Sequence, residues 1–222
     1  MATATRMAMT TTTDLLRLQT WLSPAFPVGA FSYSHGLEWA VEACLVADRP
    51  SLVAWIEGLL AFGTGRVDGM LFAAAWRAGP DGCAEIAELA AAFRGSNELA
   101  YETAQQGEAF RRAVGAGWAV AAPEAAYPVA VGAACRAAGI ARETALPFFL
   151  QAFAANLVSA GVRLVPLGQT DGVRALAALE AAIAAAAEDA RSAPLDDLGA
   201  ATPTLDWCSM KHETQYTRLF RS

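Results

Sequence analysis

The chain has 222 residues, of which 55% are hydrophobic, 17% are charged and 53 are alanine. Because alanine is the strongest helix former and charges are few, this composition favours one domain of tightly packed helices. The net charge of −6 argues against a nucleic-acid-binding domain, which would carry a basic stripe, so we expect no nucleic-acid partner.

The N-terminal part reads as a lead, a short helix and a loop. Residues 1–13 are rich in threonine and alanine and lack the apolar core of a secretory signal, so we predict a disordered lead. A helix is expected over residues 14–22, where the Ser23-Pro24 step stops it. Residues 23–34 form a loop rich in proline, glycine and aromatic residues.

The middle of the chain shows a series of helical stripes. Apolar residues spaced at i, i+3, i+4 and i+7 predict helices over residues 35–46, 51–60, 68–77, 83–94, 97–114, 128–139, 144–164 and 170–191. Ser51, Ser96 and Thr170 are the expected N-caps of three of them, and the segment 168–172 is an expected turn. No run alternates with a period of two, so no strand is predicted. The predicted fold class is all-α, a single compact domain of about ten helices over residues 14–198.

One predicted helix raises the question of a membrane span. Residues 144–162 form an uncharged run of 19 residues, which is long enough to cross a bilayer. The run contains Gln151, Asn156 and Ser159, spread along its length. A buried helix of a soluble protein is the better interpretation, and we expect no membrane partner.

The composition changes after residue 191. Residues 199–222 are predicted to be a linker and a C-terminal tail, because Pro194, Gly199 and Pro203 interrupt any helix in this part of the chain. The tail concentrates aromatic, aliphatic and guanidinium groups, which anchor protein interfaces. We expect it to be mobile in isolation and to become ordered on a partner. The alternative is that it folds back into a groove of its own domain or of a dimer mate.

Signatures of catalysis and metal binding are sparse. No phosphate-binding loop is present, and the only lysine is Lys211. His35 with Glu38 and Cys208 with His212 could each supply two metal ligands from one helix face, but neither pair has a third ligand, so we favour ordinary structural roles. Four cysteines without a CxxC pair fit a reducing cytosol. The carboxylate pairs Glu38/Glu42 and Glu98/Glu102 are interpreted as solvated helix faces.

Three segments are more specific than generic helix. They are PAFPVGAFSYSHGLE (24–38), VRLVPLGQTDG (162–172) and KHETQYTRLFRS (211–222). In this order and at this chain length they resemble the urease accessory protein family UreF. A helix with Glu102, Gln106 and Gly107 also resembles the glutamine-glycine helix of that family. Ala30 departs from the family, which more often has a second glycine there, so this position should not need a positive φ.

The resemblance implies an all-helical, non-catalytic protein. Proteins of this family act as a homodimer that joins UreD (also called UreH), recruits the GTPase UreG and docks on apo-urease. The assembly delivers nickel to urease, coupled to GTP hydrolysis by UreG. The resemblance therefore implies a cytoplasmic scaffold that binds no cofactor tightly and holds no metal site of its own, with nickel handled by the complex.

Candidate partner-binding residues lie in the tail and in the aromatic loop. They are Tyr216, Arg218, Leu219, Phe220, Arg221, Ser222, Phe31, Tyr33, His35 and Glu38. The loop is open to two interpretations, a rigid turn that packs its aromatics on the core or an interface. Arg163 is expected to sit inside, in a salt bridge. An alternative function is a small all-α enzyme that uses His35 beside Glu38 in a pocket, with His35 as the base.

Overall fold

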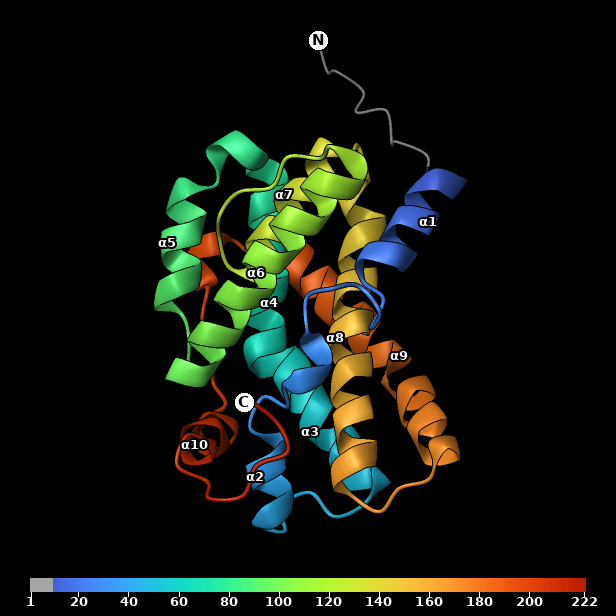
Figure 1. The fold of residues 1–222 in the computed structure, drawn as a ribbon, viewed down its shortest axis with the longest axis vertical. Coiled ribbons are helices and arrows are strands. Elements are labelled where there is room, and N and C mark those ends of the chain that lie inside the picture. Colours follow the sequence, from blue (N-terminus) through green and yellow to red (C-terminus); the bar gives the residue numbers. More distant parts are fainter. Residues whose placement is uncertain (1–9) are drawn as a thin grey trace.

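A computed structural model describes residues 10–222, and these contain ten α-helices, three 3-10 turns and no strand (Figure 1). The helices are α1 (Thr12–Trp21), α2 (Leu37–Glu42), α3 (Arg49–Phe62), α4 (Thr64–Ala78), α5 (Ala84–Ala92), α6 (Asn97–Trp118), α7 (Tyr127–Ala137), α8 (Arg142–Leu164), α9 (Gln169–Ser192) and α10 (Pro203–His212). The turns are η1 (Ala30–Ser32), η2 (Pro80–Gly82) and η3 (Leu195–Asp197). The all-α prediction is confirmed.

Helix α4 forms the centre of the domain. It buries eleven of its fifteen residues and packs against α3, α7, α8 and α9, which surround it in Figure 1. Two glycines let its neighbours come close: a Cβ on Gly69 would press on Ala190, and one on Gly132 of α7 would collide with the main-chain oxygen of Phe72. The central helix is therefore held by close packing at these glycines, which larger residues would prevent.

Helix α8 is the membrane-span candidate of the sequence. Among the described residues it is the one helix long and apolar enough to cross a bilayer, and half of its most apolar window is buried inside the protein. It packs against α9, α4 and α2. Its apolar residues therefore serve the domain core, as the sequence interpretation expected.

Several predicted helix starts need correction. Asp48, rather than Ser51, caps α3: the Asp48 side chain accepts from the Ser51 N–H at 2.9 Å, and the Ser51 hydroxyl accepts from the Asp48 N–H at 3.1 Å. Helix α9 begins at Gln169 after Gly168, so Thr170 is not its cap and residues 169–172 are helical. The cap at Ser96 is confirmed, since its hydroxyl accepts from the Leu99 N–H.

The helix predicted over residues 35–46 is shorter in the structure. Helix α2 ends at Glu42, and Cys44 takes a left-handed conformation with φ of 59°. Residues 1–9 of the lead predicted over residues 1–13 lie outside the described residues. Beyond it, Thr11 caps α1 in a reciprocal pair with Asp14, so the chain is already helical at Thr12.

The aromatic loop before α2 packs partly on the core. Phe26 is buried beside Phe110, with ring centroids 5.7 Å apart, and Tyr33 is buried too. Gly29 takes φ of 74°, whereas Ala30 begins η1 with no positive φ, as predicted. Phe31 points out and is 59% exposed. The loop thus combines a structural turn with an exposed aromatic side chain.

The end of the chain differs most from the sequence prediction. Residues 203–212 form α10, which packs against α2 and α6, and the C-terminal segment (residues 213–222) turns back to lie between them (Figure 1). Phe220 and Ser222 are buried. The expectation of a mobile tail is therefore wrong for this structure, because the segment is packed into its own domain. That was the alternative considered from the sequence.

Candidate functional site

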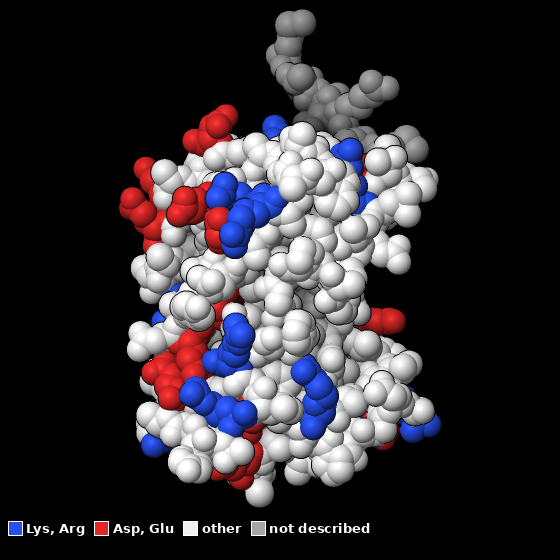
Figure 2. All heavy atoms as spheres, in the orientation of Figure 1, with Lys and Arg blue, Asp and Glu red and all other residues white. Residues whose placement is uncertain are grey.

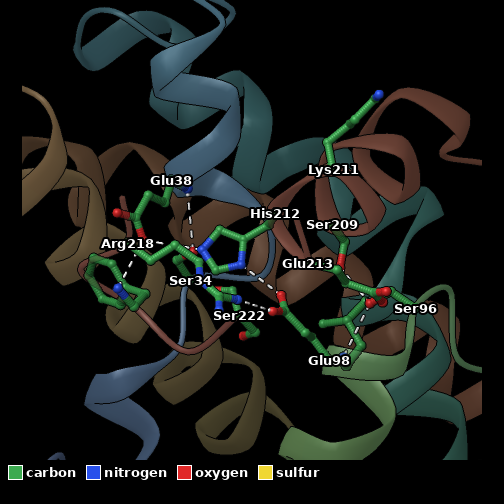
Figure 3. A network of polar contacts seen from close by, with 12 residues as sticks. Ser34, Glu38, Ser96, Glu98, Ser209, Lys211, His212, Glu213, Arg218 and Ser222 are labelled. Carbon is green, nitrogen blue, oxygen red and sulfur yellow. Dashed lines mark hydrogen bonds and ion pairs between the residues drawn. The ribbon is translucent and has the colours of Figure 1, made fainter. Parts of the chain in front are cut away.

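Three glutamates converge on the C-terminal segment, and two of them, Glu38 and Glu98, are labelled in Figure 3. Glu38 comes from α2, and Glu98 and Glu102 come from the first turns of α6. The sequence interpretation placed all three on solvated faces, and the structure corrects this: Glu38 and Glu102 are buried, Glu102 with only 3% of its surface exposed. The segment itself covers them.

Glu38 caps the backbone of the segment. Its Oε1 accepts from the Leu219 N–H at 2.6 Å, and its Oε2 accepts from the Phe220 N–H at 2.8 Å. Hydrogen bonds to an ionised acceptor are about twice as strong as neutral ones. One buried carboxylate therefore satisfies two main-chain donors of a segment that lies outside any helix.

His212 lies between two of the glutamates. Its ring is fully buried, with Nδ1 at 2.6 Å from Glu98 and Nε2 at 3.2 Å from Glu38. Arg218 reaches the same cluster, because its Nη1 lies 2.8 Å from the other oxygen of Glu98. The cluster thus joins side chains from α2, α6 and the end of the chain.

The last residues pair with the aromatic loop. The Ser34 N–H donates to the main-chain oxygen of Ser222 at 2.7 Å, and the Ser34 hydroxyl bonds the same oxygen. The Arg221 N–H donates to the Ser32 oxygen at 2.8 Å, and the Ser222 hydroxyl donates to Glu102 at 2.7 Å. Two of the three specific sequence segments therefore meet here.

The third specific segment contacts this site through Arg163, near the end of α8. Its guanidinium carbon lies 4.3 Å from the centre of the Phe220 ring, and its Nη2 donates to the Phe31 oxygen at 2.9 Å. The predicted salt bridge of Arg163 is wrong: its partners are an aromatic face and carbonyl oxygens. Partial burial lowers the pKa of this guanidinium. All three segments that carried the resemblance thus converge on residues 218–222.

Helix α10 is tied to the start of α6. The Ser96 and Ser209 hydroxyls lie 2.6 Å apart, and the Asn97 N–H donates to Glu213 at 2.8 Å (Figure 3). A carboxylate at a helix N-terminus is favoured by the helix dipole. Gly36 allows α10 to approach, since it has φ of 75° and a Cβ there would press on the Ser209 backbone.

His35 has a different carboxylate from the one expected. Its Nε2 lies 3.1 Å from Glu102, while Glu38 bonds His212 and the segment backbone. Burial opposes protonation of His35, but the charge and hydrogen bond of Glu102 and the charge of Asp68 outweigh it, so the pKa of His35 lies above its ordinary value. The proposed pairing of His35 with Glu38 in an enzyme pocket is therefore not present.

Glu102 is the common acceptor of this region. Besides His35 and Ser222 it accepts from the Gln106 side chain at 2.8 Å, one turn along α6. Gly107 follows, and a Cβ there would collide with the main-chain oxygen of Ala125. These contacts give a physical role to the glutamine and glycine singled out in the sequence.

The predicted partner-binding residues fall into two groups. An exposed group lies on the surface and comprises Phe31, Tyr216, Arg218, Leu219 and Arg221. A buried or half-buried group anchors it and comprises Tyr33, His35, Glu38, Phe220 and Ser222. Exposure alternates from Leu219 to Ser222, with Leu219 and Arg221 exposed and Phe220 and Ser222 buried. Acidic and basic side chains both gather on the surface over α10, α2 and the nearby end of α8 (Figure 2).

Sequence reasoning missed the anchoring partners Glu98, Glu102 and His212. Glu102 was noted only for the family-like helix and His212 only beside Cys208, while the i, i+4 spacing of Glu98 and Glu102 is equally typical of a solvated helix. No group of three or more His, Cys, Asp or Glu side chains in the part of the chain described here is arranged to hold a metal ion. His212 uses both nitrogens on carboxylates, and burial raises the pKa of the Cys208 thiol to about 11.

Comparison with known proteins finds one family. The family model UreF matches residues 46–180. The chain is 51% identical to the urease accessory protein UreF of Rhodopseudomonas palustris (strain BisB5), covering 94% of this chain and 91% of that one. It is 49% identical to the protein of the same name from Granulibacter bethesdensis, covering 94% of each chain, and 47% identical to that from Bradyrhizobium diazoefficiens, covering 94% and 91%.

Proposed function

Because the chain belongs to the UreF family of urease accessory proteins, we propose that it is the scaffold that joins UreD (UreH) and the GTPase UreG to apo-urease. Its role is accessory rather than catalytic. In this proposal nickel is the cargo of the assembled complex and the chain itself binds no cofactor tightly. The scaffold works in the cytoplasm as a homodimer, without a nucleic-acid or membrane partner.

One observation supports the docking role most strongly. The C-terminal segment presents Tyr216, Leu219 and Arg221 to solvent while Glu38 and Glu102 hold its backbone and end from beneath. Aromatic, aliphatic and arginine side chains are the residue types that dominate binding energy at interfaces. A segment already fixed in shape loses little conformational entropy when it binds. We therefore propose that this exposed group, with Phe31, is the surface that docks UreD.

The test is co-purification with UreD and UreG, with and without GTP, using a double variant of the exposed group. Tyr216→Ala with Leu219→Ala should leave the melting temperature unchanged, because both side chains are exposed. It should weaken UreD capture by roughly 30-fold or more, the loss expected when hot-spot residues are truncated. Recruitment of UreG and urease activation should fall with it.

A matched control is Leu16→Ala on α1, which removes an equally exposed leucine far from the chain end in Figure 1. It should bind UreD as the unmodified protein does. Unchanged UreD affinity in the double variant would show that the surface lies elsewhere. Equal loss in both variants would point to non-specific effects of apolar surface. The dimer is tested separately by sedimentation, where a monomer at micromolar concentration would contradict it.

A further inference from the structure

Guanidinium groups gather around the last residues of the chain, and the protein itself balances few of them. Arg163 and Arg221 are exposed, and neither forms an ion pair with a carboxylate in residues 10–222. Arg218 is exposed as well and pairs with Glu98 at 2.8 Å. Two of these three cations therefore have no counter-ion inside the described part of the chain.

Hydrogen bonds place the two unpaired arginines next to the exposed aromatic side chain of the loop. The Nη2 of Arg163 donates to the Phe31 oxygen at 2.9 Å, and the Arg221 N–H donates to the oxygen of the next residue, Ser32, at 2.8 Å. Phe31 and Leu219 are 59% and 65% exposed. Aromatic, aliphatic and cationic side chains thus share one patch of the surface.

The carboxylates that contact the same residues are engaged within the protein. Glu38 accepts from two backbone N–H groups of the segment, Glu98 bonds a histidine and an arginine, and Glu102 accepts from the last hydroxyl of the chain. Their side chains are only 9%, 15% and 4% exposed. The exposed Glu42 contacts Gln215, earlier in the segment. A molecule that approaches residues 218–222 therefore meets mainly positive charge, although the whole chain carries a net charge of −6.

On the basis of the docking role proposed above, we propose that the partner presents carboxylates around an apolar centre, and that these pair with Arg163, Arg218 and Arg221. A guanidinium binds a carboxylate through two parallel hydrogen bonds. Complementary charges speed the encounter of two proteins and exclude partners of the wrong charge. Arg163 and Arg218 are already held by Phe220 and Glu98, so they lose little side-chain entropy on pairing.

An anionic lipid surface is the less suitable occupant of this patch. Lipid headgroups are recognised by clusters of roughly four to eight basic residues, often lysines. The patch has fewer cations, all of them arginines, and the only lysine of the chain, Lys211, lies over the Trp207 ring of its own helix. Forked pairs with the carboxylates of a protein fit this set better.

The rate of association with immobilised UreD tests the charge pairing. The variant is Arg221→Glu, and the control is Arg112→Glu, an exposed arginine about 21 Å along α6 from Glu98. Both changes replace a positive charge by a negative one, so they alter the net charge equally. At about 50 mM salt, Arg221→Glu should associate roughly tenfold more slowly than the unmodified protein, and the control less than about twofold. At about 0.5 M salt the difference should largely disappear, because the charges are then screened.

The unmodified full chain gives a measurement that needs no variant, since its association rate should fall as salt is raised. A rate independent of salt would overturn the charge pairing, and so would equal slowing by Arg221→Glu and Arg112→Glu, which would reflect net charge alone. Binding of the unmodified chain to phosphatidylserine vesicles that is lost in Arg221→Glu would also overturn it, because the occupant would then be a lipid surface.

The docking role and the charge pairing fail in different ways. If Tyr216→Ala with Leu219→Ala weakens UreD capture while Arg221→Glu associates at the unmodified rate, the docking surface stands and the acidic partner surface is wrong. If neither change affects capture, both are wrong.

Discussion

Replacing Glu38 by alanine is expected to release the C-terminal segment while leaving the helical domain folded. The change removes the acceptor of the Leu219 and Phe220 N–H groups, at 2.6 and 2.8 Å, and one partner of His212. A hydrogen bond to a charged group contributes about 1.5–3 kcal/mol, so two of them contribute at least about 3 kcal/mol to docking. The population of open segment should rise roughly 100-fold, at about 1.4 kcal/mol per factor of ten.

Limited proteolysis with trypsin measures this opening, because cleavage after Arg218 needs a detached segment. When opening is fast relative to cleavage, the cleavage rate follows the open population. The product is followed by intact-mass spectrometry, and circular dichroism reports on the rest of the fold. Exchange of the Leu219 and Phe220 amide hydrogens gives an independent measure of the same opening.

Glu42→Ala is the matched control, on the same helix as Glu38. Its carboxylate meets only the Gln215 side chain on the surface, at 2.5 Å. Exposed contacts of this kind contribute less than about 1 kcal/mol, so cleavage should rise at most about fivefold. If cleavage in Glu38→Ala stays within that range, Glu38 does not hold the segment. If the whole domain unfolds, opening is not local and the segment is part of the cooperative core.

Three further predictions follow from other contacts. Because the pKa of His35 is raised, its pair with Glu102 stabilises the fold fully below about pH 6.5 and loses that contribution as pH rises through the raised value. The melting temperature of the unmodified protein should therefore fall above about pH 6.5, and that of His35→Gln should fall less. Arg163→Met should lower the free energy of unfolding by about 1–2 kcal/mol in urea titrations, because it removes the stacking on Phe220 and the hydrogen bond to Phe31. Arg163→Lys should retain only part of that free energy, and full retention would contradict the stacking role. Gly29→Ala and Gly36→Ala both place a side chain at φ near 75°, which costs about 1 kcal/mol. Only the Gly36 variant also collides with the Ser209 backbone, so its urea midpoint should be the lower of the two. Equal midpoints would refute the close approach of α10.

The helical fold could be predicted because its signals are local. Apolar spacing of three and four residues, and stops such as the Ser23-Pro24 step, act within one or two turns, so most of the helices and the cap at Ser96 were predicted correctly. Helix α10 was missed, because it lies in the part predicted to be a linker and tail. The cap of α3 was misplaced because Asp48 and Ser51 each accept a hydrogen bond from the backbone N–H of the other. The sequence alone does not distinguish which of the two is the first residue of the pair to precede the helix. Local patterns thus locate helices better than they locate helix ends.

The anchoring site could not be predicted in the same way. Glu38 bonds Phe220 across 182 residues, and Glu102 bonds Ser222 across 120. A glutamate that is buried by such a distant partner has the same local sequence as one that faces water. Arg163 illustrates the reverse error, because its position at the end of a buried helix suggested an inward carboxylate partner, whereas the residue is exposed and lies against the face of Phe220. The role of the exposed group in docking stays a prediction.

Glu102 contacts both His35 and Ser222, so a change at either residue influences the other. One carboxylate accepts from His35 and Gln106 at one oxygen and from the Ser222 hydroxyl at the other. When Ser222 leaves, Glu102 becomes free to bond more strongly to His35 or to water, so the proton affinity of His35 changes. Thermodynamic linkage then requires that the protonation of His35 changes the docking equilibrium of Ser222 by the same factor. A titration of His35 by NMR would therefore report, from inside the domain, whether the chain end is docked.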